Sequence, residues 1–454
     1  PAIGDAADSV CLFFNPSGQA TGLLQPNGEA VTNTYDTAGR LAAVTFPQGQ
    51  FLYAYATNGM LASAANSDGA TVFYTTDGPL VTGMRWEGPI SGSVERVFQS
   101  DLRLAALCVN GTNVVDYRYD ADGFVTNAGG LVIERHPTNA LLSRTIMGVV
   151  SDAFAWNGFG EVERYAVTNQ DAAMLQIEYG RDALGRLTEV RETAGESTTS
   201  QAFAYDLAGR LVEVTQNGAT QSRYEYDSNG NRVTEIRIEG GVEIATHLEY
   251  DDRDRIVSGT RTTDGGSAVS LEFSHDPQGN LIEQVVGTQT TRYVYDALNN
   301  LRRAELPDGR VIEYVLDGRH RPVGKRVDGV LRQGLLYGSF MHPVAELDDA
   351  GKVRSVFVYG HRATVPDGLI RDGTFYRIVS DHRGSPRAVV NTLTGEVVQE
   401  LLYDSFGRVV VDTNPGFQPF GFAGGLYDPD TRLVRFGARF YDADLGRWTQ
   451  RDPM

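Results

Sequence analysis

The stretch YDLAGRLVEVTQNGATQSRYEYDSNGNRV, residues 205–233, decides the fold of this chain. It carries the string Tyr-Asp-x-x-Gly twice, from Tyr205 and from Tyr226, and each copy supplies the Asp, Asn and Gly residues that tight turns require. Related strings recur along the chain, mostly 20 to 25 residues apart in its middle part, so the sequence predicts a repeat protein. The nine copies begin at Tyr35, Tyr119, Arg181, Tyr205, Tyr226, Tyr250, His275, Tyr295 and Tyr403.

The spacing within each unit predicts antiparallel hairpins. Aromatic residues recur two positions apart before the turn, as in Phe203/Tyr205 and Tyr224/Tyr226, and this period places both rings on one face of a strand. The 51 Gly, 21 Tyr and 20 Phe residues favour turns and strands over helices. We predict an all-β chain of roughly forty short strands in a coiled ribbon of hairpins. No unit can bury its own face, so its stability must come from neighbouring units.

The turn residues have predicted roles of their own. The Asp after Tyr is placed to accept hydrogen bonds from backbone N–H groups of its turn. The Arg after Gly, as in Arg210, is expected to reach carboxylates of neighbouring units. Over many repeats such contacts would form a charge lattice that weakens when the carboxylates are protonated.

Composition excludes several classes of protein. With 40 Lys and Arg against 58 Asp and Glu, the formal charge is −18, which argues against a nucleic-acid partner because phosphates attract basic surfaces. An apolar content of 41% excludes a disordered chain, and no stretch approaches the ~18 consecutive apolar residues of a membrane span. No basic-then-apolar leader follows Pro1, which indicates a removed leader or a piece of a longer chain. Cys11 and Cys108 lie in apolar strings and are interpreted as inert core thiols.

The YDxxGRL units resemble the YD repeats of the RHS family, which includes the C components of insecticidal toxin complexes and the animal teneurins. Two C-terminal elements strengthen the resemblance. Residues 376–410, which contain SDHRGSPR, are similar to the family's Asp-His-x-Gly-Ser/Thr-Pro-Arg element, and residues 422–453 are similar to the RHS repeat-associated core. We therefore expect an N-terminal β segment over 1–34, a YD-repeat wall over 35–375, and a core over 376–454 that is truncated at its C-terminal end.

The resemblance implies a fold and a function. In relatives the repeats wind into a hollow β-shell, which in bacterial members encloses a toxic C-terminal polypeptide, and the core closes the shell and acts as an aspartyl autoprotease. By its length this chain would form a partial wall or house a very small cargo, and we favour the partial wall.

The resemblance also implies catalytic residues, which are Arg439 and, thirteen positions later, Asp452. Two aspartates sharing a proton can activate water against a peptide carbonyl, and a guanidinium can hold one of them ionised. In relatives the second Asp and the scissile bond lie further downstream, beyond the position of Met454. A structural ion pair at the seam of the shell is an equally weighted interpretation.

The remaining polar motifs favour structural roles. Asp428, Asp430, Asp442 and Asp444 lie in YDPD and YDAD strings and are expected to cap turns. Residues 381–385 hold Asp, His and Ser too close together for a catalytic triad. The histidines are scattered without ligand spacing, so we predict no metal site and no cofactor.

The favoured function is an RHS-type scaffold that encloses a C-terminal toxin polypeptide, with a plug or a secretion apparatus as a further partner. Its expected location is outside a bacterial cell, secreted or on the surface. Two alternatives stay open. One is a teneurin-like module for surface binding or adhesion, and the other is the autoprotease itself once the missing C-terminal segment is present.

Overall fold

The computed structural model describes residues 10–339 and 341–451. They form 42 β-strands and a single 3₁₀ turn, η1 (Phe422–Gly424), with no α-helix among them. Strands β1 to β38 make one continuous sheet in which each strand pairs antiparallel with the next, and β39 to β42 make a second, small sheet. The predicted all-β ribbon of hairpins is confirmed.

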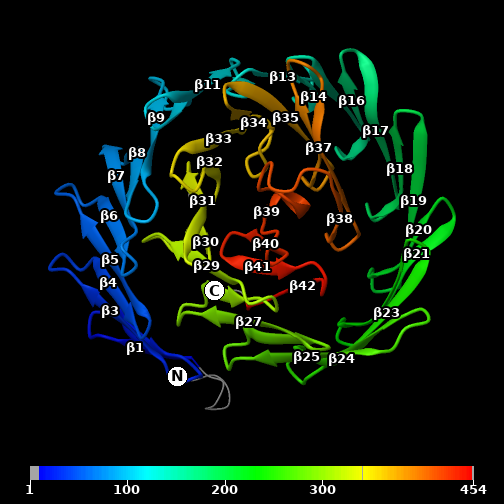
Figure 1. Cartoon of the computed structure of the whole chain (residues 1–454). Helices are drawn as coiled ribbons and strands as arrows, with labels where there is room; N and C mark the ends of the chain where they lie inside the picture. Colours follow the sequence, from blue (N-terminus) through cyan, green and yellow to red (C-terminus); the bar gives the residue numbers. More distant parts are fainter. Residues whose placement is uncertain (1–9, 340, 452–454) are drawn as a thin grey trace.

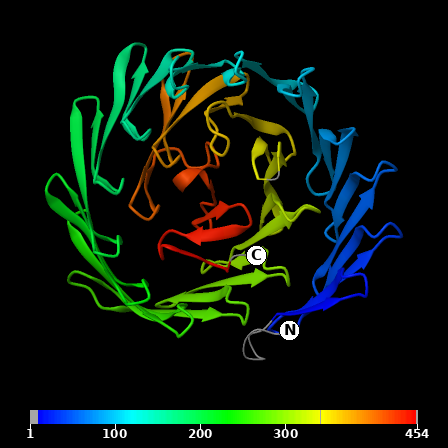
Figure 2. The ribbon, with the colours of Figure 1, turned by 180° about the vertical axis from the view of Figure 1, so that it is seen from behind.

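The large sheet winds around itself. Strands β1 to β28 follow an outer ring, and the ribbon then turns inside that ring, as the two opposite views show (Figures 1 and 2). The first half of the outer winding consists of β1 (Cys11–Phe14), β2 (Ala20–Leu24), β3 (Ala30–Tyr35), β4 (Leu41–Phe46), β5 (Gly49–Tyr55), β6 (Leu61–Asn66), β7 (Thr71–Asp77), β8 (Leu80–Glu87), β9 (Gly92–Phe98), β10 (Leu104–Val109), β11 (Asn113–Tyr119), β12 (Val125–Ala128), β13 (Leu131–Arg135) and β14 (Leu142–Met147). The second half consists of β15 (Val150–Trp156), β16 (Val162–Asn169), β17 (Ala172–Arg181), β18 (Leu187–Ala194), β19 (Ser197–Tyr205), β20 (Leu211–Gln216), β21 (Ala219–Tyr226), β22 (Arg232–Glu239), β23 (Val242–Tyr250), β24 (Ile256–Thr263), β25 (Val269–His275), β26 (Leu281–Val286), β27 (Gln289–Tyr295) and β28 (Leu301–Glu305).

The inner winding lies against the inner face of the outer one (Figure 1). Its strands are β29 (Val311–Leu316), β30 (Pro322–Val327), β31 (Val330–Tyr337), β32 (Pro343–Leu347), β33 (Val353–Val358), β34 (Gly368–Arg371), β35 (Thr374–Ser380), β36 (Pro386–Asn391), β37 (Val397–Tyr403) and β38 (Val409–Asp412). The small sheet inside it consists of β39 (Leu426–Tyr427), β40 (Leu433–Phe436), β41 (Arg439–Asp442) and β42 (Arg447–Trp448).

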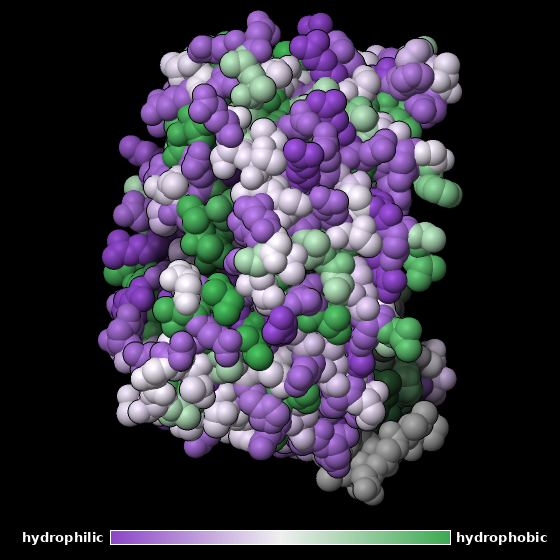
Figure 3. Space-filling model, turned by 90° about the vertical axis from the view of Figure 1, so that its right-hand side faces the viewer, coloured by the Kyte–Doolittle hydropathy of each residue, from purple (hydrophilic) through white to green (hydrophobic). Residues whose placement is uncertain are grey.

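The hydrophobic core lies between the two windings. Trp86 and Val94 of the outer winding belong to the same buried cluster as Leu336 and Val356 of the inner one. Side chains alternate between the two faces of each strand, so the outer winding turns one apolar face inward and one polar face to solvent. On β21, Ser222 and Tyr224 are buried while Arg223 and Glu225 are exposed, and the outer face of β17–β21 is mostly hydrophilic with scattered apolar patches (Figure 3). Each winding thus supplies the apolar surface that the other needs.

Each Tyr-Asp turn is stabilised from within and tied to the next unit. In the turn from Asp206, the carboxylate accepts the N–H of Arg210 at 2.8 Å and its Nε at 2.6 Å, and Gly209 has φ +81°, a backbone conformation that glycine adopts without strain. The Arg210 guanidinium lies over the ring of Tyr226 in the following unit, 4.9 Å from its centroid. The Tyr226 hydroxyl donates to the carbonyl oxygen of Leu211 at 2.8 Å.

Two expectations from the sequence need correction. In the turns of Asp36, Asp182, Asp206 and Asp404, the arginine after the glycine pairs with the aspartate of its own turn, because the closed hairpin places the two residues opposite each other. The expected contact with a carboxylate of another unit is present as well at Arg408, which pairs with Glu239 at 2.6 Å. Cys11 and Cys108 are free and half-buried, not core thiols. Cys108 alternates with the buried Leu107 and Val109 and therefore points to the opposite face of β10.

Candidate functional site

The C-terminal hairpins, β39 to β42, lie inside the ring (Figure 1). Leu433, Phe440 and Leu445 of this segment pack in one buried cluster with Leu271 and Leu301 of the outer winding. The end of the segment is attached by backbone as well, since the N–H of Leu281 donates to the carbonyl oxygen of Thr449 at 2.8 Å. The segment that the resemblance marks as catalytic is therefore fixed to the inner face of the wall.

A cavity of about 660 Å³ lies between these hairpins and strands β21 to β26. Its lining contains six arginines and two aspartates, Asp254 and Asp442. In a chain of formal charge −18, this lining gives the cavity a local excess of positive charge, which suits anionic groups. The arginines are Arg232, Arg253, Arg255, Arg439, Arg447 and Arg451.

The two sequence-predicted catalytic residues are only partly placed. Arg439 lies on β41 and lines this cavity, and its guanidinium lies over the ring of Trp448, 4.1 Å from the centroid. Asp452 lies outside the described residues. The pairing of Arg439 with Asp452 therefore stays a prediction.

Asp442 has an unusual environment that the sequence reasoning missed. Its Oδ1 accepts the backbone N–H groups of Asp444 at 2.9 Å and Leu445 at 3.1 Å, so it caps its turn as predicted. Burial, followed by repulsion from Asp444, raises the pKa of Asp442 to about 7. The sequence signal was the pair of acidic residues in YDAD, but only the tertiary structure shows that one of them is buried.

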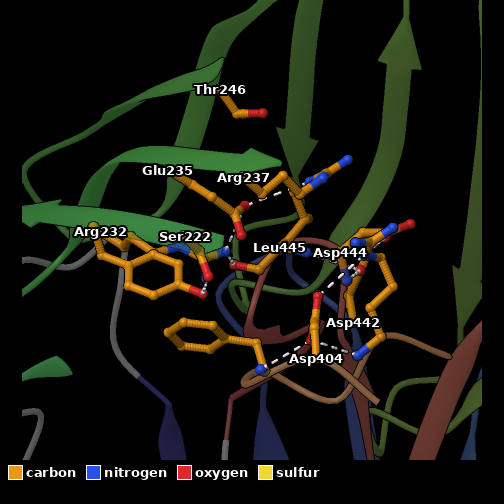
Figure 4. Close-up of polar contacts among 12 residues, drawn as sticks. Ser222, Arg232, Glu235, Arg237, Thr246, Asp404, Asp442, Asp444 and Leu445 are labelled. Carbon is orange, nitrogen blue, oxygen red and sulfur yellow. Dashed lines mark hydrogen bonds and ion pairs between the residues drawn. The ribbon is translucent and has the colours of Figure 1, made fainter. Parts of the chain in front are cut away.

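A network of charges surrounds the tip of this hairpin (Figure 4). On the wall, Glu235 lies 3.6 Å from Arg237 and 3.7 Å from Arg232. Arg232 also donates to the carbonyl oxygen of Leu445 at 2.8 Å, which joins the wall to the tip. From the hairpin, Asp444 lies 3.9 Å from Arg408. These contacts hold the C-terminal segment in register with the wall.

The other acidic residues of this region cap turns, pair with cations or do both. Asp428 caps its turn by accepting the N–H of Asp430 at 2.9 Å, and it also accepts the hydroxyl of Tyr314 at 2.6 Å. Asp430 is not used as a cap; it pairs with Lys325 at 2.6 Å. Asp444 likewise forms ion pairs. Turn capping is therefore confirmed for Asp428 and Asp442, and Asp428 also pairs with Lys325. Asp430 and Asp444 pair with cations instead.

Asp381, His382 and Ser385 do not assemble into a catalytic triad. Asp381 accepts the N–H groups of Arg383 and Ser385, each at 2.9 Å. The fully buried Ser385 hydroxyl oxygen accepts the N–H of Ala423 at 3.0 Å, whereas the His382 ring packs edge-on against Tyr179. Burial lowers the pKa of His382 to about 4. The motif joins the inner winding to η1 and to the outer wall.

Over 10–339 and 341–451, no group of three or more His, Cys, Asp or Glu side chains is arranged to hold a metal ion. In the same part of the chain, no helix has the length and apolar character to cross a membrane.

An antiparallel ribbon of Tyr-Asp hairpins, wound on itself with its C-terminal hairpins inside, defines a β-shell of the YD-repeat class. The family model described as teneurin YD-shell matches residues 6–454, and the chain belongs to this family. The resemblance to YD-repeat proteins is thereby confirmed.

Similar proteins cover nearly the whole chain. It is 28% identical over 473 residues to teneurin-1 of Gallus gallus, which matches 97% of this chain and 16% of the relative, and 28% identical to teneurin-4 of Mus musculus over 448 residues, which matches 94% of this chain and 15% of the relative. The chain thus spans about a sixth of the length of these curated relatives.

Solved structures share the fold. A crystal structure of TcdB2-TccC3-TEV superimposes with a TM-score of 0.63 at 12% identity, covering 99% of this chain and 26% of that chain. A crystal structure of TcdB2-TccC3 without its hypervariable C-terminal region gives a TM-score of 0.58 at 12% identity, covering 98% of this chain and 26% of that chain. At this identity the likeness shows the shell fold alone.

Proposed function

We propose that this chain is a shell scaffold that encloses a polypeptide joined to its C-terminal end. The observation that carries the proposal is the position of Thr449 and Gln450, which are 3% and 4% exposed. Besides the Thr449 backbone bond, Gln450 donates from Nε2 to the carbonyl oxygen of Asn299 at 2.9 Å. A segment that continues the chain beyond Arg451, which lines the cavity, would start from the inner side of the wall.

A structural neighbour also supports a scaffold that carries a polypeptide cargo. TcdB2-TccC3 carries a hypervariable C-terminal region, which is what a common scaffold with exchangeable cargo would require. For this chain we propose a toxin polypeptide as cargo, a secreted or cell-surface bacterial location, and a plug or secretion apparatus as a further partner. The segment from Tyr376 onward would then close the shell.

The size of the cavity limits the form of the cargo. A folded domain of ~100 residues has a radius of gyration of about 13 Å. The volume of such a domain is many times that of the cavity, which is about 660 Å³. The inner winding already covers much of the outer wall, so little space is left inside for a folded cargo. The cavity therefore suits an extended peptide segment. The chain would then act as a partial wall that guides the first residues of the cargo.

Protease protection tests the proposal. A flexible peptide with a site-specific protease sequence is fused after Met454, and the same peptide is fused before Pro1 as the matched control. We expect the C-terminal site to be cut at least about tenfold more slowly, which corresponds to ~1.4 kcal/mol of local opening. Protection should disappear at the urea concentration that unfolds the chain. Equal cleavage rates at both ends in the folded protein would overturn the proposal and favour a surface-binding module.

A second candidate function is self-cleavage. We propose that Arg439 and Asp452 take part in it when the segment after Met454 is present. The support is that Arg439 lines the same cavity as Asp442, whose pKa of about 7 keeps a protonated carboxyl available near neutral pH. Such a carboxyl can donate to a peptide carbonyl while an ionised carboxylate activates water.

The extended chain should yield two fragments, and Asp452→Asn should leave one intact chain. Asp442→Asn is the matched variant, because asparagine removes the ionisable carboxyl but keeps the side-chain oxygen that caps the turn. Comparing the two variants separates the contribution of the Asp442 carboxyl to cleavage from that of Asp452. Cleavage that persists in Asp452→Asn would show that this assignment is wrong.

A further inference from the structure

The chain contains 40 Lys and Arg residues, and all but two of them are arginines. The two lysines are Lys325 and Lys352. Lys352 is exposed in the turn before β33, whereas Lys325, on β30, is only 9% exposed. Arginine is the usual cation of buried ion pairs, and lysine is the cation whose amine can act as a nucleophile. The buried lysine in a chain so rich in arginine therefore indicates chemistry that an arginine cannot perform.

Two carboxyl groups contact the amine of Lys325. Its Nζ donates to Oδ1 of Asp428 and to Oδ2 of Asp430, the second at 2.6 Å. Both aspartates belong to the turn between β39 and β40, which lies beside β29 and β30 (Figure 1). Asp428 is 7% exposed, and Asp430 is half-buried. The amine of the inner winding and a carboxyl of the C-terminal hairpins thus meet away from solvent.

The surroundings of Asp428 favour a neutral carboxyl group next to a neutral amine. The hydroxyl of Tyr314 donates to Oδ2 of Asp428 at 2.6 Å. Burial, followed by the charge of Asp428, raises the pKa of Tyr314 well above its ordinary value, so this hydroxyl keeps its proton. The ring of Phe440 lies 5.2 Å from the Tyr314 ring. Burial among such groups disfavours separated charges, so a proton can pass from the Lys325 ammonium to Asp428.

We propose that Lys325 and Asp428 form an isopeptide bond, which joins the inner winding to the C-terminal hairpins. The Lys325 amine attacks Cγ of Asp428, so a bond forms between Nζ and Cγ. The bond between Cγ and Oδ1 breaks, and Oδ1 leaves as water. A proton from Nζ passes through the Asp430 carboxylate to the leaving oxygen. The products are one amide and one water molecule, and the reaction needs no oxidant or other reactant.

Each contact has a part in this reaction. Burial alone would raise the pKa of Asp430, but hydrogen bonds from Lys325 and Arg310 hold it below its ordinary value, so Asp430 is ionised and can accept the proton. The Tyr314 hydroxyl stabilises the negative charge that develops on Oδ2. The fold itself holds the amine against the carboxyl, which supplies the proximity that amide formation requires. Lys325 and Asp428 also line a cavity of about 190 Å³, which has room for the released water.

Intact-mass spectrometry of the full chain tests the proposal. We expect a mass that is lower than that of the sequence by one water molecule. Amine labelling of the denatured chain is the second measurement, with Lys352 as the internal control. Lys352 should be labelled, Lys325 should not be, and digestion should release the peptides of Lys325 and Asp428 as one branched species. The full sequence mass, with both lysines labelled alike, would overturn the proposal.

Two variants separate the covalent bond from a plain ion pair. Lys325→Arg keeps a cation between the carboxylates but has no amine, and Asp430→Asn keeps both reacting groups but removes the proton carrier. Both should have their full sequence mass and should lose the altered gel mobility that a closed loop from Lys325 to Asp428 gives the denatured wild type. Glu243→Gln, at an exposed position on β23, is the matched control and should stay linked. A mass deficit that persists in either of the first two variants would overturn the proposed reaction.

Discussion

The guanidinium of Arg377 donates a hydrogen bond of 2.6 Å to the carboxylate of Asp152, a residue 225 positions earlier in the chain. Arg377 lies on β35 of the inner winding and Asp152 on β15 of the outer one. Both are almost fully buried, and the Tyr165 hydroxyl donates to the same carboxylate oxygen at 2.8 Å. The two windings are thus joined by a charged pair inside the core as well as by apolar packing.

Arg377→Met should destabilise the chain by about 3–5 kcal/mol, because it leaves the Asp152 carboxylate buried without its cation. Urea unfolding followed by circular dichroism measures the change. Arg223→Met is the matched control, since Arg223 pairs with Glu213 on the outer face, where ion pairs contribute little. Equal midpoints for the two variants would show that the buried pair does not hold the windings together.

Gly318→Ala should destabilise the chain by about 1–3 kcal/mol. A methyl group at Gly318 would overlap the backbone of Ala64 and Ala65 on the outer winding, so the windings would have to move apart. Gly158→Ala serves as the comparison, because open space surrounds that position. Thermal melts that coincide for the two variants would contradict this close approach.

Asp442→Asn should stabilise the chain increasingly as pH rises from about 4 to 8. The pKa of Asp442 is about 7 in the folded state, above that of an unfolded aspartate, so the folded form binds a proton more tightly. The wild-type carboxyl therefore loses stability as pH rises through this window, whereas asparagine does not titrate. Urea midpoints at four pH values check the effect. Parallel pH profiles for wild type and variant would contradict it.

The carboxylates of the repeat turns should determine how much stability the fold loses at low pH. Hydrogen bonds from the backbone N–H of Arg210, and then from its guanidinium, hold the pKa of Asp206 below its ordinary value, and Arg40 does the same for Asp36. A lowered pKa stabilises the folded state above about pH 4, and this stability is lost as pH falls further. Asp206→Asn should thus lower the melting temperature at pH 6 and make it less sensitive between pH 4 and pH 2. A variant with the acid sensitivity of the wild type would exclude this role.

Most of the fold was predictable because it repeats. The turn residues and the aromatic residues two positions apart are local signals. They recur in unit after unit, including the one that begins at Tyr205. The partner of each turn arginine was not predictable in this way. Arg210 could reach several carboxylates by spacing, and only the closed hairpin places it opposite Asp206.

The candidate site was predictable only in part. The resemblance placed Arg439 in the C-terminal core, and the structure puts it in a cavity of basic character. The burial of Asp442, by contrast, depends on the wall from Arg232 to Arg261, which lies some two hundred residues earlier.

The amino-acid sequence alone determined that this chain is a ribbon of β-hairpins, because each turn and each strand is specified by residues within about ten positions of one another. Only the tertiary structure decided that the ribbon coils inside itself and fills much of its own interior. That outcome depends on contacts between the apolar faces of distant strands, such as those that carry Trp86 and Leu336, which pack in one core. A local sequence pattern does not predict which of these faces will pack together.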